Sequence, residues 1–161
     1  MNSEEYYEYA KKLGRKIFVE KFPEGENVIA QNAYYSYAYA INFLRGRFPE
    51  GEKAIAQDAF CAYAYARGVI GGRFPEGEKA IAKDEKYAYE YARDVIKGRW
   101  PEGENVIAQK ANWAYAYAKD IIQGRFPEGE EIILKSEYAI EYKKFLPKKM
   151  PIEFSSFFKK K

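Results

Sequence analysis

The chain has 161 residues, of which 47% are hydrophobic and 32% charged, so it is long enough for one domain or short repeat array and can bury a core. It has no His and one cysteine, Cys61, which excludes an internal disulfide and removes the commonest general base and metal ligand. No stretch approaches the roughly 20 apolar residues of a membrane span, and the acidic N-terminus is not typical of a signal peptide, so we expect a cytoplasmic protein.

The net charge of +3 is unevenly distributed. Residues 143–161 contain seven Lys and one Glu, whereas residues 1–142 contain 20 basic and 23 acidic residues. A mildly acidic body therefore precedes a basic tail. Because nucleic-acid-binding proteins usually carry a clear basic footprint, this balance argues against nucleic-acid binding by the body.

The motif F/W-P-E-G-E recurs five times at intervals of 26 residues. Its copies begin at Phe22, Phe48, Phe74, Trp100 and Phe126. A fixed interval of this length is the signature of a repeat array. We therefore predict an all-α solenoid of five helix-turn-helix repeats over residues 21–146, in units that start near residues 21, 47, 73, 99 and 125. Capping segments are expected at both ends, as a helix within residues 1–20 and a basic aromatic tail over residues 147–161.

The N-terminal capping helix is predicted over residues 2–20, with Ser3 as its N-cap. Its Tyr7, Tyr9 and Ala10 match the Tyr-x-Tyr-Ala sequence found in the units. A terminal unit of this kind presents a polar outer side to solvent.

The first helix of each unit is predicted to begin at the motif's Pro and to run for eight or nine residues. The second helix begins after an N-cap at Asn32, Asp58, Asp84 or Ser136, whereas Lys110 breaks this rule in the fourth unit. Its end is predicted at a left-handed glycine. These glycines are Gly46, Gly72, Gly98 and Gly124.

Helical periodicity places Ala62, Ala66, Val69 and Ile70 on one face of a second helix, where small residues let a neighbouring helix approach closely. Two tyrosines flank that face in each unit and are expected to reach the units on either side. These structural aromatics are Tyr37, Tyr39, Tyr63, Tyr65, Tyr89, Tyr91, Tyr115 and Tyr117. Cys61 occupies a position held elsewhere by an aromatic residue, which indicates packing rather than nucleophilic catalysis.

Two charged patterns have competing interpretations. Glu50 and Glu52, with their equivalents, could bind a hard cation, but acids in a first helical turn more commonly complement the helix dipole. A ladder of arginines could grip phosphates, although each lies beside a Glu-rich turn and pairing with Glu is the simpler outcome. The ladder consists of Arg47, Arg73, Arg99 and Arg125.

Positions that vary between units on the exposed side of the second helix are free for recognition. This candidate partner-binding face contains Tyr34, Ile41, Arg45, Phe60, Arg67, Lys86, Arg93, Lys97, Asn112 and Lys119. Its first two units are the more apolar, and an exposed apolar patch marks an interaction site. Alternatively, the N-terminal cap or a second copy of the chain covers the patch.

The last second helix, over residues 137–146, is shortened and rich in Lys, and Pro147 and Pro151 end it. In the tail that follows, Phe154, Phe157 and Phe158 lie among lysines. The tail is expected to cap the last unit, with contact to an acidic partner, nucleic acid or a membrane surface as the alternative.

The string G-R-F/W-P-E-G-E followed by Tyr-Ala-x-x-V/I-I-x-G-R resembles short tandem repeats of bacteriophage-encoded proteins over residues 21–146. In those repeats an Ala often replaces the Gly of P-E-G-E, and Asp-Pro often opens the second helix, where this chain has Asp58-Ala59 and Asp84-Glu85. The resemblance implies a helical repeat array and a viral origin, hence the host cytoplasm, but no activity.

No catalytic, metal or cofactor site emerges from these patterns. We expect a non-enzymatic scaffold, a viral protein that engages a host protein, with counter-defence as a possible role. One alternative is a nucleotide-binding module that sequesters a signalling nucleotide or holds single-stranded nucleic acid through Tyr and Arg. Another is a homo-oligomeric structural element.

Overall fold

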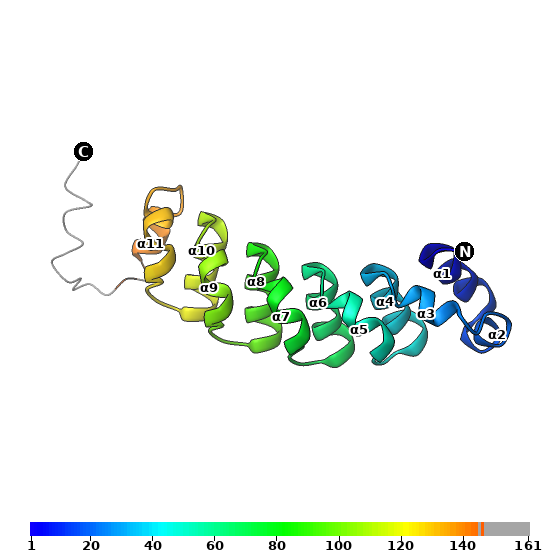
Figure 1. Cartoon of the computed structure of the whole chain (residues 1–161). Helices are drawn as coiled ribbons and strands as arrows, with labels where there is room; N and C mark the ends of the chain where they lie inside the picture. Colours follow the sequence, from blue (N-terminus) through cyan, green and yellow to red (C-terminus); the bar gives the residue numbers. More distant parts are fainter. Residues whose placement is uncertain (145, 147–161) are drawn as a thin grey trace.

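The computed structural model describes residues 1–144 and Leu146, which form helices and turns without a β-strand. Successive helix pairs lie side by side in one gently curved row, with the N-terminus at one end (Figure 1). The chain is therefore an all-α array of paired neighbouring helices, as the 26-residue period predicts. We number the units 1 to 5 from residues 21, 47, 73, 99 and 125.

Two helices, α1 (Ser3–Leu13) and α2 (Arg15–Lys21), precede the units. The first helices of units 1 to 5 are α3 (Gly25–Ile29), α5 (Pro49–Ile55), α7 (Pro75–Ile81), α9 (Pro101–Ile107) and α11 (Pro127–Leu134). The second helices are α4 (Ala33–Tyr39), α6 (Ala59–Tyr65), α8 (Glu85–Tyr91), α10 (Ala111–Tyr117) and α12 (Ala139–Lys143). In units 1 to 4 the second helix continues into a π-helical turn, namely η1 (Ala40–Leu44), η2 (Ala66–Ile70), η3 (Ala92–Ile96) and η4 (Ala118–Ile122).

The first helices of units 2 to 5 begin at Pro, as predicted, because the missing Pro N–H would have no helical acceptor there. Two Glu residues occupy the first turn of each, near the positive end of the helix dipole. These helices have seven or eight residues, slightly fewer than expected. In unit 1 the helix α3 has only five residues and begins at Gly25, two positions after Pro23.

The second helices of units 1 to 3 carry the predicted N-caps. Oxygens of Asn32, Asp58 and Asp84 accept hydrogen bonds from the backbone N–H three residues later, at 3.1, 2.8 and 3.0 Å. Lys110 makes no such bond at the start of α10. Ser136 does not cap α12, because that helix begins only at Ala139 and is preceded by a turn.

The left-handed residue that ends each second helix lies one position before the predicted glycine. In unit 2 the carbonyl oxygen of Ala66 accepts hydrogen bonds from the N–H groups of both Gly71 and Gly72, and only Gly71, with φ of 68°, is left-handed. Equivalent residues are Arg45, Lys97 and Gln123. The prediction that Gly46, Gly72, Gly98 and Gly124 are left-handed is therefore wrong. The residue before each of these glycines is the left-handed one. Since the turn recurs in four units, it belongs to the repeat architecture.

Small residues bring each first helix close to the second helix of the preceding unit, as predicted. A Cβ atom added to Gly77 would lie 2.7 Å from Cβ of Ala62 and 2.6 Å from the Phe74 ring. Gly129 meets Ala114 in the same way, and Gly51 meets Ser36. The glycine of P-E-G-E is thus a contact residue between units.

The N-terminal cap consists of two helices instead of the single predicted one, because Gly14 adopts φ of 74° and divides them. Its N-cap is Asn2, not Ser3: the Asn2 side chain accepts a hydrogen bond from the backbone N–H of Glu5, and the Glu5 carboxylate accepts one from the backbone N–H of Asn2, both at 2.9 Å. The Ser3 hydroxyl instead donates to the carbonyl of Val28 at 2.7 Å and joins α1 to α3.

Tyr7 lies against Tyr35 of α4, with ring centroids 5.5 Å apart, so α1 covers the end of the array. Tyr9 is 43% exposed, unlike the fully buried Tyr39 to which the sequence likened it. At the other end, the basic aromatic tail over residues 147–161, with Phe154, Phe157 and Phe158, lies outside the described residues.

Candidate functional site

The arginine ladder is paired with glutamate. Arg73 forms two parallel hydrogen bonds of 2.8 Å to the carboxylate of Glu78, at the start of α7 of its own unit. Equivalent pairs are Arg47–Glu52, Arg99–Glu104 and Arg125–Glu130. The guanidinium is the main cause that lowers the pKa of Glu52, Glu78 and Glu104. The ladder therefore does not offer free guanidinium groups to phosphates, and the nucleotide-binding alternative loses its main support.

A buried tyrosine completes each pair. The hydroxyl of Tyr91 donates to Glu78 at 2.8 Å and accepts from the N–H of Phe74 at 3.0 Å. Tyr65, Tyr117 and Tyr142 make the same two contacts in units 2, 4 and 5. Their rings, like those of Tyr39 and Tyr91, are fully buried. The second tyrosine of Tyr-x-Tyr thus joins the two helices of its own unit, while its ring packs on the next unit, as Tyr65 does on Phe74 at 5.3 Å.

Unit 1 keeps this network with a different arginine. Tyr39 donates to Glu26 at 2.6 Å, and Arg15 of α2 lies 3.2 Å from the same carboxylate. Lys21 holds the sequence position of the ladder arginine in this unit. The cap thus supplies the guanidinium that the first motif lacks.

The second Glu of the motif is therefore structural in every unit, and Glu50 is exposed on the same helix turn as the paired Glu52. No cluster of three potential metal-binding side chains exists within the described part of the chain. Glu50 and Glu52 both lie in the first turn of α5, near the positive end of the helix dipole.

The residues of the candidate partner-binding face lie at the start of the second helices of units 1 to 4, in their π-helical turns and, for Arg45 and Lys97, at the left-handed residue that follows the turn. We call it the variable face. Tyr34 is 55% exposed and Phe60 is 40% exposed. The remaining exposed members are Arg45, Arg67, Lys86, Arg93, Lys97, Asn112 and Lys119. Ile41 is only half-buried rather than exposed, because it packs over Gly68 of the next unit.

Aromatic rings form a second layer beneath the variable face. Tyr63 stacks on Tyr87 with centroids 5.9 Å apart, and Tyr89 lies 5.4 Å from Trp113. In unit 2 the position of Tyr87 and Trp113 is held by Cys61. Phe60 instead contacts Tyr37, at 6.2 Å, and Tyr87, at 5.7 Å. Phe60 therefore has a packing role as well as an exposed edge.

The first tyrosine of Tyr-x-Tyr joins neighbouring units through an aspartate. Tyr63 donates to Asp94 at 2.6 Å, and Tyr89 donates to Asp120 at 2.7 Å. Sequence reasoning assigned no role to Asp94 or Asp120 and therefore missed this contact. The constant separation of 31 residues between donor and acceptor was the available signal. Both tyrosines of the pair contact the following unit, rather than the two units on either side.

Cys61 is buried, with 2% exposure, as a packing residue should be. Burial is the main cause that raises the pKa of its thiol to about 12, and Asp58 adds to the shift. At neutral pH the thiol is protonated, so it is a poor nucleophile.

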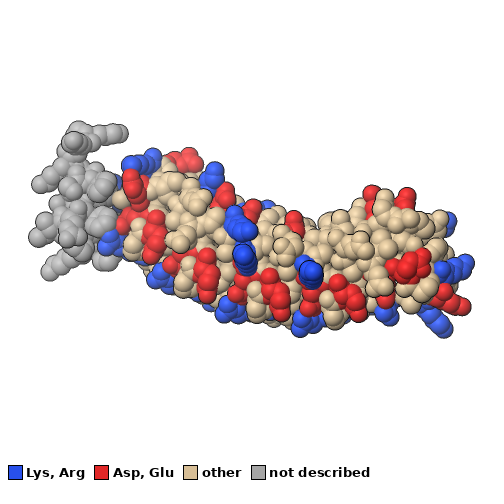
Figure 2. Space-filling model, viewed as in Figure 1, with Lys and Arg blue, Asp and Glu red and all other residues tan. Residues whose placement is uncertain are grey.

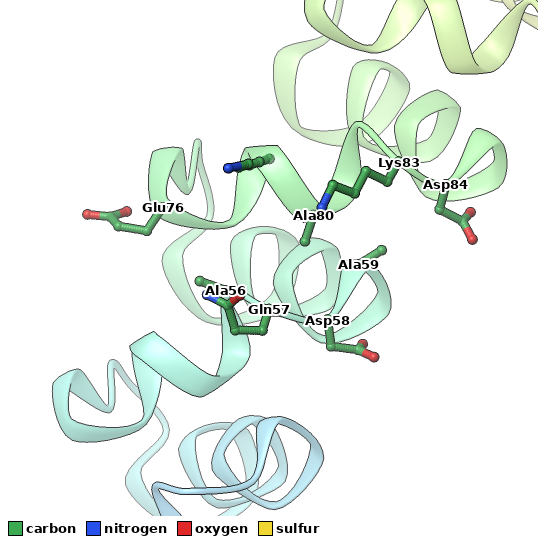
Figure 3. A pocket seen from close by; sticks show the side chains of 9 residues that line it. Ala56, Gln57, Asp58, Ala59, Glu76, Ala80, Lys83 and Asp84 are labelled. Carbon is green, nitrogen blue, oxygen red and sulfur yellow. The ribbon is translucent and has the colours of Figure 1, made fainter.

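Shallow grooves lie along the first helices of neighbouring units. The groove between α7 and the turn that follows α5, of about 440 Å³, is lined by Gln57, Glu76, Lys79 and Lys83 among others. Figure 3 shows the Lys83 side chain running back towards Ala80, whereas Glu76 points away from the groove. Similar grooves lie between α3 and α5 and between α9 and α11. These grooves recur because the units repeat, so they do not distinguish one unit as a binding site.

Charged side chains are dense along the lower edge of the array in Figure 2 and lie also at its upper edge near both ends, with a largely uncharged band between them. None of the described helices combines the length and apolar character needed to traverse a bilayer. Comparisons with protein-family models, curated proteins and solved structures found no match to this chain. The assignment of the candidate site therefore rests on a comparison of the repeat units within this chain.

Proposed function

We propose that this chain is a non-enzymatic scaffold that binds a protein partner through the variable face of units 1 and 2. The observation that carries the proposal is the pair of exposed rings, Tyr34 and Phe60, at equivalent positions of α4 and α6. Units 3 and 4 have Lys86 and Asn112 there, so the repeat itself does not require an aromatic residue. Large aromatic side chains are enriched among the residues that dominate binding energy in protein interfaces.

Basic residues lie on the same variable face as the two rings. Arg45 and Arg67 are exposed on the same face, and the Arg67 side chain is 63% exposed. An apolar centre with a charged rim is the usual arrangement of a protein-binding surface. The partner therefore presents an apolar patch with acidic groups beside it.

We further propose that the partner is a host protein and that the chain is viral. The resemblance of its repeats to bacteriophage-encoded repeats supports this origin. Because the described ladder arginines are paired with Glu, a protein partner fits the molecule better than a nucleotide.

The test is capture of a partner from bacterial lysate by the tagged full chain, with identification by mass spectrometry. The double variant Tyr34→Lys/Phe60→Lys introduces the residue that unit 3 already carries, and Asn112→Lys makes the same change in unit 4. We expect the double variant to lose the partner and Asn112→Lys to keep it, with circular dichroism to verify folding. Capture that survives the double variant would contradict this binding face, and recovery of only the chain's own copies would favour the homo-oligomeric alternative.

A further inference from the structure

The contact between successive units has a standard form in the middle of the array. At the junction of units 2 and 3, the Asp94 carboxylate accepts a hydrogen bond from the Tyr63 hydroxyl at 2.6 Å and from Arg93 at 2.6 Å. Arg67 lies 3.6 Å from the same carboxylate. At the junction of units 3 and 4, Asp120 accepts from Tyr89 at 2.7 Å. A tyrosine hydroxyl of one unit thus donates a hydrogen bond to an aspartate carboxylate of the next unit.

The junction of units 1 and 2 has the tyrosine but lacks the carboxylate. Tyr37 is the equivalent of Tyr63 and Tyr89, and position 68, the equivalent of Asp94 and Asp120, is glycine. Within residues 1–144, no hydrogen bond satisfies the Tyr37 hydroxyl. Of the three junctions between units 1 and 4, this one alone therefore presents a donor without its carboxylate.

A cation accompanies the missing carboxylate. Arg67 precedes Gly68 as Arg93 precedes Asp94, so it lacks the adjacent carboxylate that holds Arg93. Its contacts are long, an ion pair to Asp94 at 3.6 Å and a hydrogen bond to the Tyr63 hydroxyl at 3.5 Å, and its side chain is 63% exposed. Burial raises the pKa of Tyr37, and the positive charge of Arg67 opposes that rise.

Apolar side chains border the same position. Cδ1 of Ile41 lies 3.2 Å from the place where a Cβ atom on residue 68 would stand. On the other side, the Phe60 ring packs on Tyr37 and keeps an exposed edge. Gly68 itself is exposed. The position therefore combines a hydroxyl donor, a guanidinium and two apolar walls on the surface.

We infer that this open position beside Gly68, Tyr37 and Arg67 receives an Asp or Glu side chain of the protein partner, with an apolar partner residue seated against Phe60 and Ile41. The carboxylate would take the place that Asp94 and Asp120 hold at the later junctions. A single exposed guanidinium matches the single charge of a carboxylate, and hydrogen bonds to charged groups are among the stronger ones. This inference rests on the proposed binding function and specifies the chemistry of its partner.

The test uses N-acetyl-Asp-Phe-amide as a probe in a nuclear magnetic resonance titration of the full chain. We expect shifts at Gly68, Tyr37 and Arg67 that saturate, and affinity roughly ten-fold or more lower for N-acetyl-Asn-Phe-amide, which lacks the charge. Gly68→Asp should supply the carboxylate from the chain itself and abolish probe binding, with circular dichroism to verify folding. Equal binding of the two probes, or unchanged binding by Gly68→Asp, would overturn the inference.

A matched variant opens the next junction. Asp94→Gly removes the carboxylate beside Tyr63, and circular dichroism verifies that the array still folds. We expect it to give a second set of shifts with the Asp probe, around residues 63 and 94, and no such set would count against the inference. Partner capture that persists while the Asp probe causes no shifts would refute this carboxylate site alone and leave the proposed scaffold function standing.

Discussion

The Tyr91 hydroxyl lies 2.8 Å from the Glu78 carboxylate and joins the second helix of unit 3 to its first. The same carboxylate holds Arg73 through two hydrogen bonds. Because the motif supplies both Arg and Glu and Tyr-x-Tyr supplies the hydroxyl, the network is a product of the repeat. It explains why the most strictly repeated charged residues of the chain are structural.

Substitution of Glu78 by Gln should destabilise the array by about 1–3 kcal/mol, because the half-buried carboxylate bonds to Arg73 and Tyr91 at once. Glu76→Gln is the matched control, since Glu76 is exposed on the same helix turn and surface changes usually stay within about 0.5 kcal/mol. Urea unfolding followed by circular dichroism measures both. Equal stability of the two variants would show that the network contributes nothing.

The sequence predicted the unit, the helix starts of the central units and the small-residue contact because each depends on one residue type, such as Pro75, Asp84 or Ala62. It misplaced the helix end because the π-helical turn depends on how the loop up to Gly72 closes around the Ala66 carbonyl. It also missed the bond between Tyr63 and Asp94, since partners 31 residues apart meet only once units are stacked.

Acid should destabilise the array through its paired carboxylates. The folded-state pKa values of Glu52, Glu78 and Glu104 are lowered, mainly by Arg, and that of Asp94 is lowered to about 2. A lowered folded-state pKa gives stability that is complete above the unfolded value, about 4.3 for Glu and 3.9 for Asp. The melting temperature should therefore fall as the pH drops from about 4.3 towards 2. The fall should be smaller in Glu78→Gln, and an identical pH profile would contradict this assignment.

Two glycines of unit 2 and unit 3 should respond in opposite ways to Ala. A Cβ atom on Gly77 would lie 2.7 Å from that of Ala62, so Gly77→Ala must separate two units and should destabilise the protein by about 1–3 kcal/mol. Gly72 has no atom within 4 Å of such a Cβ and no positive φ, so Gly72→Ala should leave stability unchanged or slightly raised. Thermal unfolding measures the stability of both variants. A large loss of stability in Gly72→Ala would indicate that Gly72 is left-handed after all.

The buried thiol of Cys61 should react slowly in the native state. Its 2% exposure and its pKa of about 12 both suppress the thiolate. Ellman's reagent at pH 8 should label the folded chain at least ten-fold more slowly than the chain in denaturant. Comparable rates would mean that the second helix of unit 2 opens readily or that the thiol is accessible.

The missing cap of unit 4 offers a gain in stability. Lys110 stands where Asp84 accepts hydrogen bonds from the N–H groups of Lys86 and Tyr87, and it makes no such bond to α10. Lys110→Asp should satisfy an exposed N–H and complement the helix dipole, and thus stabilise the array by about 1 kcal/mol. Lys110→Ala is the control, because it removes the lysine without adding an acceptor. If both variants unfold at the same urea concentration, the N-cap does not limit the stability of this unit, and the contacts between units decide it instead.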